Sequence, residues 1–313
     1  MKIIRSIDSI SSEFAKGSSL TLGNFDGIHL GHQTLLYRTV EIARDLSIPS
    51  VVVTYHPNPA VVLGKKPNFK YLSLEEEKEE LIRQFAIDYL VVLEFTETLS
   101  KMSAEDFLDN IIIQKLNAKY IVIGYNHFFG SNRRGDYSLL DANKVKYGYQ
   151  VELKEAVLQN NSKISSSLIR GYLEKGEMHE AKSLLGRNYH LRGKVVHGLK
   201  RGRTIGFPTA NLEIHPNRLL PSFGVYACFV YIEGKCYSGM MNIGFNPTFG
   251  GEKINVEVNI FDFESDIYSQ IIELELVGKV RDEKKFNGID ELKKQLAEDK
   301  KESLAILDFN HVI

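Results

Sequence analysis

The chain has 313 residues, of which 43% are hydrophobic and 25% are charged, and its formal net charge is −1. This length suits two ordinary domains, and the composition excludes a disordered chain. The near-zero net charge argues against general binding of the whole protein to nucleic acid or membrane surfaces. The N-terminal residues show no apolar targeting segment, no apolar run is long enough to span a membrane, and the two cysteines, Cys228 and Cys236, form no metal-type cluster. We therefore expect a soluble cytoplasmic protein.

The first half of the chain alternates between strand-like and helix-like patterns. Strands are predicted at residues 19–25, 50–55, 88–95, 119–125 and 150–157, and helices at 30–46, 74–86, 103–116 and 137–147. This alternation predicts an α/β domain with a parallel sheet that helices cover on both faces. Ligands of such sheets bind beyond the carboxyl ends of the strands, so the loops that begin at Gly23 and Gly124 are candidate site loops.

The pattern changes near Gly186, where short strands with twofold alternation replace the strand–helix alternation. Strands are predicted at residues 190–196, 225–232, 236–243, 255–261 and 271–280, and a final helix begins near residue 288. Glycine and proline separate these strands, which is typical of a small antiparallel β-barrel. We therefore expect two domains, at residues 1–186 and 187–313.

The most informative segment joins the first predicted strand to the first predicted helix. It reads Gly23-Asn24-Phe25-Asp26-Gly27-Ile28-His29-Leu30-Gly31-His32 and resembles the His-x-Gly-His signature of the nucleotidyltransferase superfamily. A helix N-terminus presents N–H groups and the positive end of the helix dipole to phosphate, and the glycines allow close backbone approach. His29 and His32 can then donate hydrogen bonds to α-phosphate oxygens that gain charge during phosphoryl transfer. A glycine-rich turn with two surface histidines is the alternative interpretation of this motif taken alone.

A second candidate phosphate site follows the last predicted strand of the first half. It reads Lys163-Ile164-Ser165-Ser166-Ser167-Leu168-Ile169-Arg170. Serines are favoured as N-caps, and capping alone would explain them. Beside the His-x-Gly-His loop, Ser166 and Ser167 would instead form a second phosphate-binding helix start. Arg170 would add a bidentate, permanently charged contact to the β- and γ-phosphates.

Two segments of the second half carry candidate chemistry. The first is Gly198-Leu199-Lys200-Arg201-Gly202-Arg203-Thr204-Ile205-Gly206-Phe207-Pro208-Thr209-Ala210-Asn211. Taken alone it indicates a solvated basic loop or a nucleic-acid patch, although no interleaved aromatic residues support the patch. In the second, residues 255–261, Glu257 lies on the polar side of a strictly alternating strand, where a purely structural role is also possible.

Together these motifs occur in the order seen in prokaryotic bifunctional riboflavin kinase/FAD synthetase, and the resemblance spans nearly the whole chain. It rests on the candidate phosphate-binding segments Gly23–His32 and Lys163–Arg170 and on the loop Gly124–Gly130. It also rests on the glycine-rich Pro-Thr-Ala-Asn segment and the strand around Glu257. The resemblance implies a Rossmann-like nucleotidyltransferase domain followed by a riboflavin kinase barrel with a C-terminal helix. The implied activities are ATP-dependent phosphorylation of riboflavin to FMN, then adenylyl transfer from ATP to FMN, which gives FAD and pyrophosphate.

The resemblance also implies roles for particular residues. His29, His32 and Arg170 would be the catalytic groups of adenylyl transfer, and Glu257 would accept the proton of the riboflavin 5′-hydroxyl. Thr209 and Asn211 would give oxygen ligands to Mg²⁺, which prefers oxygen. The residues implied to bind ATP or flavin are Gly23, Phe25, Asp26, Gly27, Gly31, Asn126, Ser166, Ser167, Gly198, Arg203, Gly206 and Pro208.

Three positions depart from the family pattern. Ser167 replaces threonine, Asn58 replaces histidine, and Phe128 stands where many members carry a polar residue, which leaves the FMN contacts open. Adenylyl transfer to another acceptor, such as a pantetheine phosphate, and a regulatory barrel that binds flavin or RNA are the alternative functions. The Pro-Thr-Ala-Asn segment with Glu257 favours the bifunctional enzyme over both. We expect riboflavin, FMN, FAD and ATP as partners, no nucleic acid or membrane, and a monomer or weak homo-oligomer.

Overall fold

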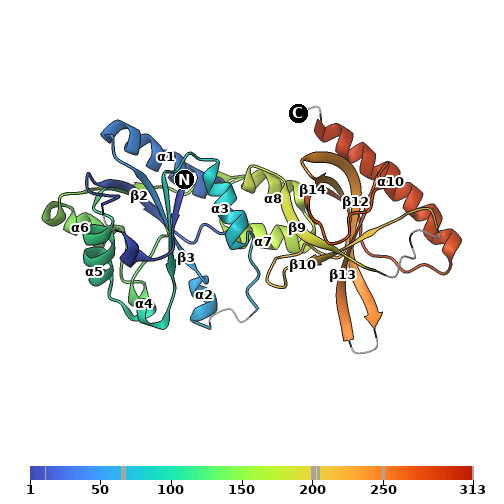
Figure 1. The fold of residues 1–313 in the computed structure, drawn as a ribbon, viewed down its shortest axis with the longest axis horizontal. Coiled ribbons are helices and arrows are strands. Elements are labelled where there is room, and N and C mark those ends of the chain that lie inside the picture. The colour runs from blue at the N-terminus through green and yellow to red at the C-terminus, as the bar shows by residue number, and fades with distance from the viewer. Residues whose placement is uncertain (11, 65–67, 199–201, 203–204, 249–250, 312–313) are drawn as a thin grey trace. The chain divides into compact units, whose positions relative to one another are not determined.

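The computed structural model describes residues 1–10, 12–64, 68–198, 202, 205–248 and 251–311. Its contacts divide the chain into two compact units, Met1–Ser166 and Ser167–Ile313 (Figure 1). Each unit has a sheet of its own. Among the described residues, no helix is both long and apolar enough to cross a membrane.

The first unit is built on a six-stranded sheet in the order β1-β4-β3-β2-β5-β6. All neighbouring strands are parallel, which confirms the predicted α/β class. The three-residue strand β1 was not predicted, because so short a segment shows no periodicity. The strands are β1 (Lys2–Ile4), β2 (Ser18–Leu22), β3 (Ser50–His56), β4 (Tyr89–Glu94), β5 (Ala118–Gly124) and β6 (Gln150–Lys154).

Helices cover both faces of this sheet, as the buried side chains show. In β3, Val51 and Val53 join one hydrophobic cluster, whereas Val52 joins another. The cluster around Val52 includes side chains of α1 and α3, and the opposite cluster includes those of α5 and η2. Strands buried on both faces read as continuous apolar runs. The connecting elements are η1 (Ile7–Ser9), α1 (Leu30–Leu46), α2 (Pro59–Val62), α3 (Glu75–Arg83), α4 (Glu97–Lys101), α5 (Ala104–Asp106), the π-helical η2 (Phe107–Lys115), η3 (Ser131–Arg133), α6 (Tyr137–Tyr147) and the hairpin β7 (Leu158–Gln159) and β8 (Ser162–Lys163).

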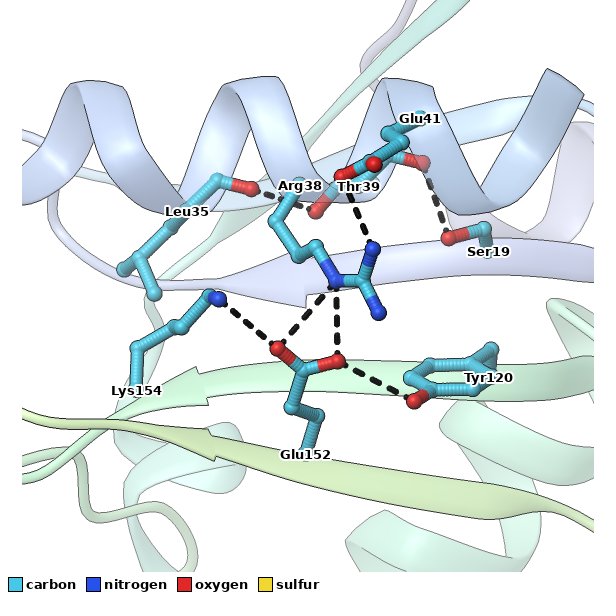
Figure 2. A network of polar contacts seen from close by, with 8 residues as sticks. All are labelled: Ser19, Leu35, Arg38, Thr39, Glu41, Tyr120, Glu152 and Lys154. Carbon is cyan, nitrogen blue, oxygen red and sulfur yellow. Dashed lines mark hydrogen bonds and ion pairs between the residues drawn. The ribbon is translucent and has the colours of Figure 1, made fainter. Parts of the chain in front are cut away.

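A polar network fixes α1 against the edge of the sheet (Figure 2). Arg38 Nε donates to both carboxylate oxygens of Glu152 at 2.9 and 3.2 Å, and Arg38 Nη1 donates to Glu41 at 2.8 Å. The Tyr120 hydroxyl and the Lys154 ammonium reach the same Glu152 carboxylate at 3.1 and 2.8 Å. Partial burial favours the neutral form of Glu152, but the hydrogen bonds from Lys154, Arg38 and Tyr120 together lower its pKa. The network therefore holds the helix that begins at the candidate phosphate loop.

Strand order locates the ligand-binding end of the sheet. From central β2 the chain continues to β3 and β4 on one side, and then crosses to β5 and β6 on the other. Ligands of open α/β sheets bind at such a reversal, beyond the carboxyl ends of the strands. The loops after β2 and β5, which begin at Gly23 and Tyr125, flank this switch point.

In the second unit, six antiparallel strands close into a barrel in the order β10-β13-β12-β11-β14-β9. The predicted barrel and C-terminal helix are confirmed, whereas the short strand β10 was not predicted. Helix α8 packs on β9 and β14, and the Ser222 amide donates to the Leu173 carbonyl of α7, so these helices contact the barrel. The elements are α7 (Ser166–Lys175), α8 (Met178–Leu185), β9 (Tyr189–Val196), β10 (Ala210–Ile214), β11 (Gly224–Ile232), β12 (Lys235–Thr248), β13 (Gly251–Ile260), β14 (Ile271–Arg281) and α10 (Ile289–His311).

Candidate active sites

The loop between β2 and α1 has an unusual backbone. Phe25, Gly27 and Ile28 have positive φ angles of 49°, 85° and 40°. Such angles are unfavourable for phenylalanine and isoleucine, but the side chains of both are fully buried in the core and thereby hold the loop in this conformation. A strained loop held by core packing is pre-organised before any ligand arrives.

The two histidines of the signature lie together at the start of α1. Their rings stack with centroids 3.7 Å apart, and His29 is only 6% exposed. His29 caps the helix, because its Nδ1 accepts a hydrogen bond from the His32 amide at 3.2 Å. A neutral imidazole whose Nδ1 accepts carries its proton on Nε2. His29 therefore has the tautomer that can donate a hydrogen bond from Nε2.

Asp26 holds the loop against the segment before α3. Its Oδ1 accepts hydrogen bonds from the amides of Leu72 and Ser73 at 2.9 and 3.1 Å, and the Ser73 hydroxyl accepts from the Gly27 amide at 3.0 Å. The Ser166 hydroxyl donates to the Asp26 carbonyl at 2.9 Å. These bonds bring two predicted residues, Asp26 and Ser166, into one cluster. They also show that the Asp26 carboxylate faces protein amides.

The other predicted residues of the nucleotide site are placed as follows. The Gly23 amide donates to the Val53 carbonyl, and a Cβ at Gly31 would lie 3.2 Å from the His29 ring. Ser167 and Arg170 lie in α7, three residues apart, and belong to the second compact unit.

The loop after β5 carries Asn126 and two exposed aromatic rings. Phe128 is 42% exposed, with the Arg133 guanidinium 4.3 Å from its ring centroid, and Lys163 lies 4.9 Å from the ring of Tyr125. Between Asn126 and Phe128 lies His127, whose Nε2 is buried. Burial lowers the pKa of this imidazole to about 4. This imidazole is therefore neutral near pH 7.

In the barrel, the predicted kinase residues meet on neighbouring strands. Asn211 of β10 lies directly opposite Glu257 of β13 in the strand register. The Thr209 hydroxyl donates to Glu257 Oε2 at 3.1 Å, and Asn255 Nδ2 donates to Oε1 at 2.6 Å. A Cβ at Gly198 would lie 2.1 Å from Asn211 Nδ2, so a larger residue there would displace the Asn211 amide group. Thr209 and Asn255 thus hold the two oxygens of the Glu257 carboxylate. The side-chain oxygens of Thr209 and Asn211 are of the kind that Mg²⁺ prefers as ligands.

The turn before β10 is held by β13. Asn259 Nδ2 donates to the Pro208 carbonyl at 2.6 Å, and Gly206 has a positive φ of 85° that favours glycine. Arg203 lies outside the described residues. Sequence reasoning missed Asn255 and Asn259 as site residues, although the strict alternation of β13 placed both on the polar side with Glu257.

Comparisons with known proteins agree with this geometry. A family model described as FAD synthetase matches residues 11–168, and one described as riboflavin kinase matches residues 185–307. The bifunctional riboflavin kinase/FMN adenylyltransferase of Bacillus subtilis (strain 168) is 39% identical over 300 residues, which cover 94% of each chain. The chain belongs to the bifunctional riboflavin kinase/FMN adenylyltransferase family. It is therefore an enzyme, and its two domains correspond to the two steps of FAD synthesis.

Other relatives extend over the same length. The bifunctional riboflavin kinase/FMN adenylyltransferase of Haemophilus influenzae is 36% identical and covers 96% of this chain and 97% of its own. A solved structure described as a macrolide-efflux protein from Streptococcus pneumoniae is 35% identical, with a TM-score of 0.86 and coverage of 96% of this chain and 97% of that chain. The chain thus shares the architecture of that solved structure along nearly its whole length.

Proposed function

We propose that the barrel phosphorylates riboflavin and that the site at the sheet switch point transfers AMP to FMN. The observation that carries this proposal is the meeting of Thr209, Asn211 and Glu257, which sets the Glu257 carboxylate near two side chains whose oxygens would suit Mg²⁺. For the second step, the stacked pair of His29 and His32 at a helix N-terminus supports phosphate chemistry.

In the kinase step, Glu257 accepts the proton of the riboflavin 5′-hydroxyl while that oxygen attacks the γ-phosphorus of ATP. The bond from the γ-phosphorus to the bridging oxygen breaks, and ADP leaves. Asn255 and Thr209 hold the two oxygens of the Glu257 carboxylate. Thr209 and Asn211 would hold Mg²⁺, which offsets phosphate charge when bound with ATP.

In the adenylyl step, a phosphate oxygen of FMN attacks the α-phosphorus of ATP, and pyrophosphate leaves. No proton needs to be removed from the attacking phosphate, so the site needs no general base. His29 and His32 donate hydrogen bonds to the α-phosphate oxygens, where charge increases in the transition state. Ser166, Ser167 and Arg170 would bind the β- and γ-phosphates. A cytoplasmic location and a monomeric or weakly associated state complete the proposal.

Product analysis with the full chain tests whether the barrel phosphorylates riboflavin and the first unit transfers AMP to FMN. Riboflavin and Mg²⁺-ATP should give FMN and then FAD, separated by chromatography. A double variant, His29→Ala with His32→Ala, should stop at FMN. Asn211→Ala should make FAD only when FMN is supplied. Loss of both steps in either folded variant, or of neither, would contradict the assignment of one step to each site.

A further inference from the structure

Glu257 lies in the middle of a row of polar side chains that crosses three strands of the barrel. In the strand register, Asn211 of β10 lies opposite Glu257 of β13, and Asn242 of β12 lies opposite it on the other side. Directly opposed residues of antiparallel strands point to the same face of the sheet, with Cβ atoms about 5 Å apart. The three side chains therefore share one face of the barrel wall.

One end of this row is the nucleotide side of the kinase site. The Thr209 hydroxyl donates to Glu257 Oε2 at 3.1 Å, and Asn211 follows Thr209 closely in the chain. Thr209 and Asn211 are the residues that would hold Mg²⁺ with ATP. In phosphoryl transfer the attacking and leaving oxygens lie roughly in line, on opposite sides of the phosphorus. The acceptor hydroxyl therefore approaches Glu257 from the side away from β10, which is the side of β12.

The polar neighbours of Glu257 along its own strand are already engaged with the protein. Asn255 Nδ2 donates to Glu257 Oε1 at 2.6 Å, and Asn259 Nδ2 donates to the Pro208 carbonyl at 2.6 Å. Asn242 differs from both, because it is half-buried and its side chain makes no hydrogen bond within the described part of the chain. Its amide group keeps donors and an acceptor for a ligand.

The surroundings of Asn242 are polar on a second side. Gly244 is the next residue of β12 on the same face, and a Cβ at Gly244 would lie 3.4 Å from Asn242 Nδ2. The same Cβ would collide with Oε1 of Glu283, an oxygen that accepts a hydrogen bond from the Phe245 amide at 3.3 Å. The lack of a side chain at Gly244 thus brings an amide and a carboxylate close together. Both groups form hydrogen bonds with hydroxyls, so this part of the row suits a polyol.

We propose that Asn242 is a substrate-binding residue of the kinase step, which holds the 4′-hydroxyl of the riboflavin ribityl chain while Glu257 accepts the proton of the 5′-hydroxyl. The inference rests on the proposed function of the barrel and adds the acceptor side to it. The two hydroxyls are on adjacent carbons and the two side chains are on adjacent strands, so one extended chain reaches both. A site whose polar group bonds a hydroxyl rejects an analogue that lacks it, because that group is then left unpaired.

A substrate analogue tests the inference in the full chain. The analogue 4′-deoxyriboflavin lacks the proposed contact but keeps the 5′-hydroxyl that is phosphorylated. For the parent, kcat/KM with this analogue should be about 10- to 100-fold below kcat/KM with riboflavin, measured as the ADP that the kinase step releases. Asn242→Ala should lower kcat/KM for riboflavin by a similar factor and should use both flavins equally well. Such coupling between one side chain and one substrate hydroxyl is not expected of a merely structural residue.

Matched variants locate the effect. Asn211→Ala, on the other side of Glu257, should raise KM for Mg²⁺-ATP and keep the preference for riboflavin over the analogue. Asn217→Ala removes an exposed asparagine of the same unit and should match the parent. Asn242→Val, whose side chain is favoured in strands, repeats the test if the alanine variant does not fold. Hydrogen exchange in β11 and β14 reports whether each variant folds.

Each outcome decides a separate question. If the parent chain makes no FMN from riboflavin, the proposed function fails, and this inference fails with it. If the parent phosphorylates riboflavin and the analogue equally well, the proposed function stands and the inference is overturned. If a folded Asn242 variant keeps the preference of the parent for riboflavin, the inference is also overturned, because another group then binds the 4′-hydroxyl. Loss of the preference in the Asn242 variants but not in Asn211→Ala supports it.

Discussion

The imidazole of His127, whose Nε2 is buried, should make the stability of the first unit depend on pH. Burial lowers its pKa to about 4, against an ordinary value of 6.5 in the unfolded chain. Between these values the unfolded chain binds a proton that the folded unit excludes. The stabilising contribution is therefore complete above pH 6.5 and is lost as the pH falls towards 4. With about 1.4 kcal/mol per pH unit, the loss reaches about 3 kcal/mol at pH 4.

The assay is hydrogen exchange in urea, which gives a free energy of unfolding for the β5 peptide without relying on tryptophan, which the chain lacks. His127→Phe keeps a ring next to Phe129 and removes the titrating group. Its free energy of unfolding should fall about 3 kcal/mol less than that of the parent between pH 7 and pH 4. The control is His179→Phe, because His179 is an exposed histidine of the second unit.

Other titrating groups contribute to the pH dependence of both proteins, and the comparison between parent and variant removes their common part. Equal pH dependence of the two proteins would refute the reasoning. It would mean that the His127 ring reaches water, or gains a partner, when it is protonated.

Four further outcomes follow from the structure. His29→Ala should slow FAD formation from FMN on the order of 10²- to 10³-fold and leave riboflavin phosphorylation intact, as measured by product chromatography. Glu257→Gln should slow riboflavin phosphorylation by roughly 10²- to 10⁴-fold, whereas supplied FMN should still become FAD. If the variant phosphorylates riboflavin at the parent rate, Glu257 has only a structural role on the polar side of its strand. Asn255→Ala, which releases one oxygen of that carboxylate, should lower kcat of the kinase about tenfold with KM for ATP unchanged. In thermal unfolding, a fragment of residues 167–313 should melt at least about 10 °C above one of residues 187–313, because α8 buries apolar side chains against the barrel. Equal melting temperatures would show that α7 and α8 do not stabilise the barrel.

The sequence by itself determined the fold class and the identity of the motifs. Helix α1 matches its predicted bounds of 30–46, because its apolar residues recur at the helical period and a glycine-rich loop precedes it. The alternation of β13 likewise placed Glu257 on the polar face. These features are local, since they depend on residues within one or two turns or one strand.

Only the tertiary structure decided which residues support the sites. Asp26 meets the Leu72 and Ser73 amides across 46 and 47 positions of sequence, and Asn259 meets the Pro208 carbonyl across 51. No periodicity links such distant residues, so the pattern of β12 gave no reason to distinguish Asn242 from a solvated asparagine. Packing also decided that α7 and α8 belong with the barrel, although the strand pattern changes only near Gly186. The physical reason is that burial and charge pairing depend on how elements come together in space, whereas a sequence pattern reports only which face of each element is apolar.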